Sequence, residues 1–115
     1  MSSTILDNQE ELNGVTIEVL ELIDNLKKKT RESMVIGEAS IIRGITLFEE
    51  VIKELNPDKI DDNIISMIIS YVNIILFKQE EKRQHVDAGV RYGVNECYML
   101  IDMYNKRKKR ELVIA

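Results

Sequence analysis

Residues 85–94 read HVDAGVRYGV, and they place Gly89 and Gly93 one turn apart in a stretch otherwise patterned as an amphipathic helix. Each glycine inside a helix costs about 1 kcal/mol relative to alanine, so the pair needs a structural reason. Small residues four apart let two helix backbones approach closely, and Ser40 and Gly44 offer a matching pair earlier in the chain. We therefore expect the helices containing Gly44, Gly89 and Gly93 to cross closely, with dispersion contacts offsetting the lost propensity. The alternatives are backbone exposed for a ligand or a partner helix, and a kink or break at Gly89.

Two segments before Pro57 carry an apolar residue every three or four positions. These residues are Leu12, Val15, Val19, Leu22 and Leu26 in the first segment, and Ile41, Ile45, Phe48, Ile52 and Leu55 in the second. This period places them on one face of a helix, which predicts a helical hairpin over residues 12–56. The second helix should end near Asn56, because the residue before a proline disfavours helical geometry. A third helix can then begin at Pro57.

The segment after Pro57 is apolar on nearly every side of a helix. Residues 64–77 read IISMIISYVNIILF, and the polar side chains here fall on a single helical line, Asn63, Ser66, Ser70 and Asn73. A helix this apolar is buried on most sides, and a small bundle has too few helices to cover it. We therefore predict that the line of four polar residues packs against another protein chain. The alternative is a central helix whose serines bond to their own backbone.

The end of the chain holds a polar stretch and a fourth helix. Residues 78–85, KQEEKRQH, are either a loop or a solvated helical bridge. The fourth helix follows, with an apolar face at Val86, Val90, Val94, Cys97, Ile101 and Tyr104. Four helices in 115 residues predict one all-α domain over 1–115, a mostly antiparallel four-helix bundle with short loops. We expect 1–11 and 109–115 to be flexible ends.

The composition is that of a globular protein with 44% hydrophobic and 31% charged residues. Its single cysteine excludes an intramolecular disulfide. The longest apolar run, residues 64–77, is shorter than the stretch of about 20 residues that spans a bilayer. We therefore expect a cytoplasmic protein, of a bacterium or an infected host cell, with no membrane partner.

The residue types that carry chemistry are sparse. His85 is the only histidine and Cys97 the only cysteine, so a metal cluster of several histidines cannot be assembled in one chain, and no G-x-S-x-G motif is present. Cys97 lies on the apolar face, as expected of a small buried hydrophobe. We predict no enzyme, no metal and no cofactor. An enzyme would need a pocket lined by acids and by tyrosines such as Tyr92, Tyr98 and Tyr104.

A basic block is the one localised charge feature. Its members are Lys106, Arg107, Lys108, Lys109 and Arg110. Five adjacent bases can bind phosphates with an affinity that depends strongly on salt. The net charge of −4 and the lack of interleaved aromatic residues make nucleic acid a secondary partner at most. The alternative is a solvated cationic end that favours the helix dipole.

These observations predict a protein that binds rather than catalyses. We expect a small, dimeric adaptor or inhibitor that docks on a larger protein through a helical surface. Its size and its Ile-, Lys- and Asn-rich composition would suit an accessory protein of a phage or mobile element acting on a host complex. A regulator that binds nucleic acid through the basic block is the alternative.

Overall fold

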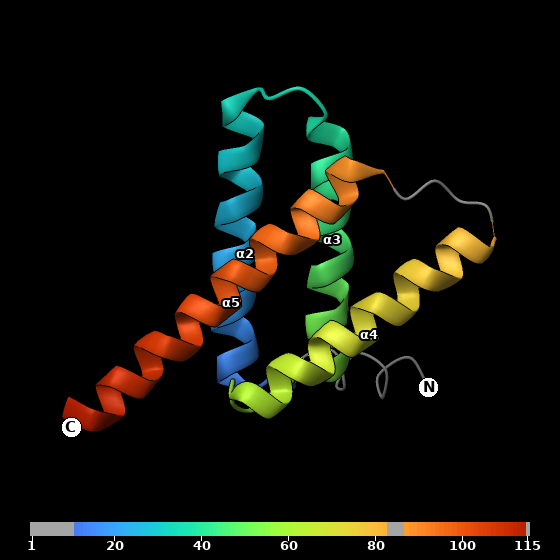
Figure 1. Cartoon of the computed structure of the whole chain (residues 1–115). Coiled ribbons are helices and arrows are strands. Elements are labelled where there is room, and N and C mark those ends of the chain that lie inside the picture. Colours follow the sequence, from blue (N-terminus) through green and yellow to red (C-terminus); the bar gives the residue numbers. More distant parts are fainter. Residues whose placement is uncertain (1–10, 83–86, 115) are drawn as a thin grey trace.

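The computed structural model describes residues 11–82 and 87–114, with side chains as far as Glu111. This part of the chain forms an all-α bundle of four helices, which confirms the predicted fold class. The helices are α2 (Gly14–Ser33), α3 (Glu38–Leu55), α4 (Asp62–Glu81) and α5 (Ala88–Ile114). The helices α2 and α3 form the predicted hairpin, and α5 runs obliquely across it (Figure 1).

The helix α3 is the centre of the core, because the three most extensive contacts between helices all involve it. Its apolar face meets α2 on one side, α5 on another and α4 near its C-terminal end (Figure 1). The largest fully buried apolar side chains are Phe48, Ile45 and Ile52 of α3, Ile23 of α2, Ile68 of α4 and Ile101 of α5. In α3 the predicted apolar spacing therefore fills the core. In α2 only Val19 of the predicted face is buried, and Ile23, which lies outside the predicted spacing, fills the core beside it.

The turn between α2 and α3 has a defined backbone. Met34 caps α2 at φ 51°, with its N–H donating to the carbonyl of Arg31. Gly37 precedes α3 at φ 82°, a left-handed geometry that glycine adopts without a Cβ penalty. Two left-handed residues in four therefore reverse the chain within a short turn.

The connection from α3 to α4 is held against the start of α2. The side chain of Asn13 donates to the carbonyl of Asn56, and the hydroxyl of Thr16 donates to the carbonyl of Pro57, both at 2.8 Å. The prediction that a helix begins at Pro57 is wrong, because α4 begins at Asp62. Pro57 instead gives its carbonyl to α2, and Asp61 caps α4 by accepting from the N–H of Ile64 at 2.9 Å.

The predicted glycine positions lie where α3 and α5 cross. A Cβ on Gly44 would overlap the carbonyl oxygen of Val90, and a Cβ on Gly93 would overlap the carbonyl oxygen of Ile41. A Cβ on Gly89 would overlap the Cβ of Ser40. The backbones of the two helices therefore approach each other too closely for larger residues at these three positions.

Asp87 fixes the start of α5 beside the start of α3. Its carboxylate accepts from the N–H of Val90 at 3.0 Å and from the hydroxyl of Ser40 at 2.7 Å.

The polar stretch 78–85 begins as a helix, because α4 extends through Glu81, and residues 83–86 lie outside the described residues. Residues 109–114, expected to be flexible, continue α5 as a helix, and residues 1–10 lie outside the described part.

Candidate protein-binding surface on α4

The outward face of α4 is exposed along most of its length. Asn63, Ser66, Ser70 and Asn73, the predicted partner-binding residues, all lie on this face and are all exposed. Three large apolar side chains lie among them: Met67 is 51%, Ile74 55% and Phe77 61% exposed. We call these seven residues the outward strip of α4. The strip is mixed, with small polar groups between apolar side chains that remain in water.

The position of α4 at the edge of the bundle explains why the strip is open. Only Ile68, Val72 and Leu76 of this helix are buried, and they lie on the side that faces α3 and α5. The C-terminal half of α4 extends away from the α2–α3 hairpin (Figure 1). Within the described residues, the hydroxyls of Ser66 and Ser70 make no hydrogen bond to their own helix, which was the alternative interpretation of these serines.

The strip also lies in the longest uncharged stretch of the chain. Residues 63–77 contain no Asp, Glu, Lys or Arg, although 31% of the whole sequence is charged. In contrast, the apolar side chains that α5 exposes, Tyr92, Met99 and Met103, have Glu96 and Asp102 between them along the helix. An exposed apolar strip without charges is typical of the centre of a protein interface, where charged residues are depleted.

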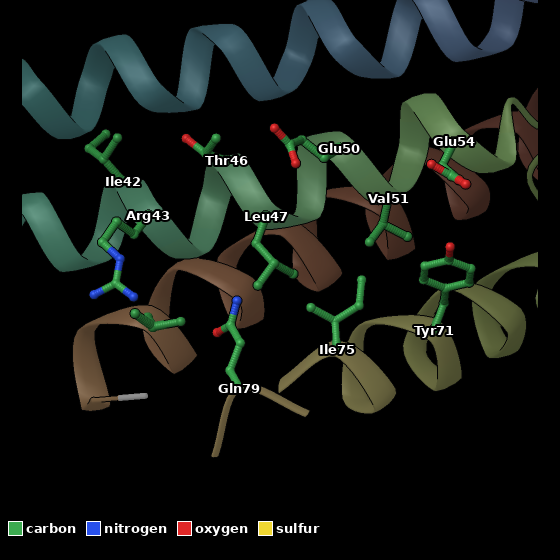
Figure 2. Close-up of a pocket in the computed structure, with 11 residues that line it drawn as sticks. Ile42, Arg43, Thr46, Leu47, Glu50, Val51, Glu54, Tyr71, Ile75 and Gln79 are labelled. Atoms are coloured by element: carbon green, nitrogen blue, oxygen red, sulfur yellow. The ribbon is translucent and has the colours of Figure 1, made fainter. Parts of the chain in front are cut away.

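A groove of about 410 Å³ lies between α3 and α4. Leu47 of α3 and Ile75 of α4 point toward each other across its middle (Figure 2). Arg43 and Gln79 lie at one end, and Glu54 and Tyr71 at the other (Figure 2). Neither Arg43 nor Glu54 has an ion pair within the described part of the chain. The groove therefore has an apolar floor with charged side chains on its rim.

Sequence reasoning missed this groove and one further apolar cluster. The groove forms because α4 diverges from α3, and the spacing within either helix carries no signal for the angle between them. The second cluster is the α2–α3 turn, where Met34 is 84% and Ile36 101% exposed. An uninterrupted Met-Val-Ile run between two helices, residues 34–36, was its visible signal.

The basic block is largely neutralised by acids of the same chain. Lys106 pairs with Asp102 at 3.0 Å and Lys109 with Asp62 at 3.4 Å. Lys108 lies 3.5 Å from Glu111 and 3.9 Å from Glu18, over the ring of Tyr104. Only Arg107 and Arg110 have no ion pair among the described residues. The block is therefore a mixed-charge surface, which weakens its attraction for phosphates.

Most of the remaining candidate residues lie in or against the core, one faces solvent, and one lies outside the described residues. Cys97 is fully buried, and burial raises the pKa of its thiol to about 12, with the charges of Glu49 and Glu96 acting in the same direction. Tyr98 packs edge-on against Phe48 with ring centres 5.3 Å apart. Tyr104 is 3% exposed, whereas Tyr92 faces solvent. His85 lies outside the described residues.

The described residues hold no group of three or more His, Cys, Asp or Glu that could bind a metal ion. None of the four helices, as far as they are described, has the length and apolarity needed to cross a membrane. No protein family, curated protein or solved structure matches the chain.

Proposed function

We propose that the chain is a non-catalytic protein-binding module, an adaptor or inhibitor, which docks on another protein through the outward strip of α4. The observation that carries this proposal is the exposure of Met67, Ile74 and Phe77 on a helix face without charges. Burying these side chains against a partner would stabilise the complex by about 25 cal/mol for each Å² of apolar surface removed from water. The small side chains of Ser66 and Ser70 would let a partner approach the helix backbone.

The α3–α4 groove extends this proposal. It lies on the α3-facing side of α4, so this helix contributes both to the groove and to the strip. A partner segment that fits the groove would place apolar side chains against Leu47 and Ile75. It would carry an acid opposite Arg43 and a base opposite Glu54.

A photo-crosslinking experiment in the protein's own host cells tests this function. Benzoylphenylalanine placed at Ser70 should give a discrete adduct with one protein, because Ser70 lies at the centre of the strip. The same probe at Met103, which is exposed on α5, is the matched control and should not give that adduct. Phe77→Lys in the probe-bearing chain should abolish the adduct by placing a charge in the contact. The proposal would be refuted if Phe77→Lys left the adduct unchanged, or if the probe at Met103 gave the same adduct in equal amount.

Replacement of the basic block distinguishes the nucleic-acid alternative from docking through α4. Replacing the five bases at 106–110 by Gln should leave the Ser70 adduct unchanged if docking is through α4. A loss of salt-sensitive DNA or RNA binding in this variant would instead support the regulator. The four ion pairs that already engage Lys106, Lys108 and Lys109 favour the docking interpretation.

A further inference from the structure

We propose that the outward strip of α4 binds the same strip of a second copy of this chain, in an antiparallel arrangement with a two-fold axis beside Ser70. This inference rests on the proposed function and names the partner. Such an arrangement leaves the α3–α4 groove of each copy open to a larger protein.

The positions of the exposed residues are balanced about Ser70. Met67 lies three residues before it and Ile74 four residues after it, on the same side of the strip, because successive residues turn by about 100°. Asn63 and Phe77 lie seven residues before and after Ser70, close to the centre line. In an antiparallel pair, each Met67 therefore faces the Ile74 of the second copy, and each Asn63 faces its Phe77. A self-complementary surface of this kind is what a two-fold interface requires.

The absence of charge within the strip selects a partner that is also uncharged. A partner with Lys or Glu opposite residues 63–77 would bury those charges without counter-charges, which is costly. The α4 of a second copy presents an uncharged surface of the same length. The small side chain of Ser70 at the centre permits close approach of the two helices, and large apolar side chains lie before and after it along the helix.

The charges beyond the ends of the strip favour the antiparallel orientation. Asp58, Asp61 and Asp62 lie before or at the start of α4 with only Lys59 among them, whereas Lys78 and Lys82 at its end are balanced by Glu80 and Glu81. An antiparallel pair keeps the two acidic ends apart and opposes the two helix dipoles. A parallel pair would place the two acidic ends side by side.

The size of the strip sets the expected strength. Fifteen helical residues extend about 22 Å, and a contact one helix wide is smaller than the standard interface of about 1,600 Å². We therefore expect a dimer that dissociates on dilution, which calls for a trapping experiment rather than chromatography alone.

Cysteine trapping on the full chain tests the arrangement directly. The only native thiol, Cys97, is fully buried, so an engineered surface cysteine is the sole reactive one. With helix axes about 8–10 Å apart and Cα atoms about 2.3 Å from each axis, two central Cα atoms lie about 4–5 Å apart, within disulfide range. Ser70→Cys should therefore form a disulfide-linked dimer under mild oxidation, about tenfold or more faster than Met103→Cys, because association raises the effective thiol concentration.

The orientation is tested by two further variants. In the antiparallel pair two Met67 positions are offset along the axis by about 9 Å, beyond disulfide reach. Met67→Cys alone should therefore remain monomeric, while a mixture of Met67→Cys and Ile74→Cys should form the mixed dimer. Circular dichroism melting establishes that each exposed-site variant is folded. Without added cysteines, sedimentation should show a concentration-dependent dimer that Phe77→Glu removes and Met103→Glu keeps.

The outcomes separate this inference from the proposed function. Rapid self-linking of Met67→Cys would mean a parallel pair and would overturn the antiparallel arrangement. If Ser70→Cys links no faster than Met103→Cys and the chain sediments as a monomer, the second copy is not the partner. A Ser70 photo-adduct of a mass other than twice that of the chain would then keep the proposed function and reject only this inference.

Discussion

The carbonyl oxygen of Ile41 lies where a Cβ on Gly93 would have to be placed. This relationship joins the backbones of α3 and α5 at the crossing on which most of the core depends. The two helices cannot move apart without uncovering buried side chains. Glycine is therefore required at position 93 by the neighbouring backbone of α3 and not by its own backbone conformation.

Gly93→Ala should destabilise the fold by about 1–3 kcal/mol, because the added methyl group overpacks the crossing. Helix propensity alone would predict a gain of about 1 kcal/mol, so the sign of the change is diagnostic. Gly14→Ala is the matched control, since nothing lies within 4 Å of a Cβ there. Urea unfolding of both variants measures the difference. Equal stability of the two would contradict the close crossing.

Thr16→Val should cost about 1–3 kcal/mol, because it keeps the shape of the side chain but leaves the carbonyl of Pro57 without its buried donor. Thr30→Val is the control, since the hydroxyl of Thr30 bonds only to the carbonyl of Leu26 in its own helix. Thermal unfolding should separate the two valine variants. A larger loss for Thr30→Val would argue against the role of Thr16 in holding the α3–α4 connection.

Asp61→Ala should lower the melting temperature at pH 7 and have little effect in acid. The pKa of Asp61 is lowered, chiefly because its carboxylate accepts a hydrogen bond from the N–H of Ile64, and Lys59 adds to this. A lowered pKa stabilises the folded state above the ordinary range of Asp and loses that contribution as the pH falls below about 4. Melting curves from pH 7 to pH 3 test this, with the exposed Asp58→Ala as control. A difference that persists unchanged at pH 3 would exclude the charged cap.

Cys97 should be unreactive toward a thiol reagent at pH 8 in the folded protein and reactive in urea. Its pKa of about 12 reflects burial, so the folded state holds its proton at a pH where the unfolded state releases it. That stability is present below the ordinary thiol pKa and is lost as the pH rises toward the folded value. Between pH 9 and 11 the wild type should therefore lose stability relative to Cys97→Ala, by roughly 1 kcal/mol per pH unit. Parallel pH profiles of the two proteins would contradict the burial of the thiol.

The hairpin and its crossing helix could be predicted from sequence because each depends on a periodic or local signal. The spacing of Ile45 and Ile52 in α3, or of Val90 and Val94 in α5, encodes one buried face without knowledge of the partner. Gly44 and Gly93 encode a close approach because a helix interior otherwise disfavours glycine. The start of α4 at Asp62 could not be predicted, since the carbonyl of Pro57 is used by Thr16, 41 residues earlier.

The candidate surface was predictable only in part for the same reason. The line from Asn63 to Asn73 is a one-dimensional pattern, but the exposure of Met67 and Phe77 depends on how far α4 diverges from α3. Lys109 of α5 pairs with Asp62 of α4, and the run of five bases in the sequence does not indicate this pairing. Tertiary placement, rather than local chemistry, decides each of these features.

The central position of α3 has a consequence for the order in which the chain folds during synthesis. Its nearest partner in sequence, α2, is available first, but α5, with which it shares its most extensive contact, is made only after all of α4. Until then the glycine-bearing side of α3 has no cover. Closing this contact spans the 32 residues between Leu55 and Ala88, a non-local step that slows folding. The nascent α2–α3 hairpin therefore waits with its apolar face open, which makes it the species most prone to mispairing with a neighbouring chain.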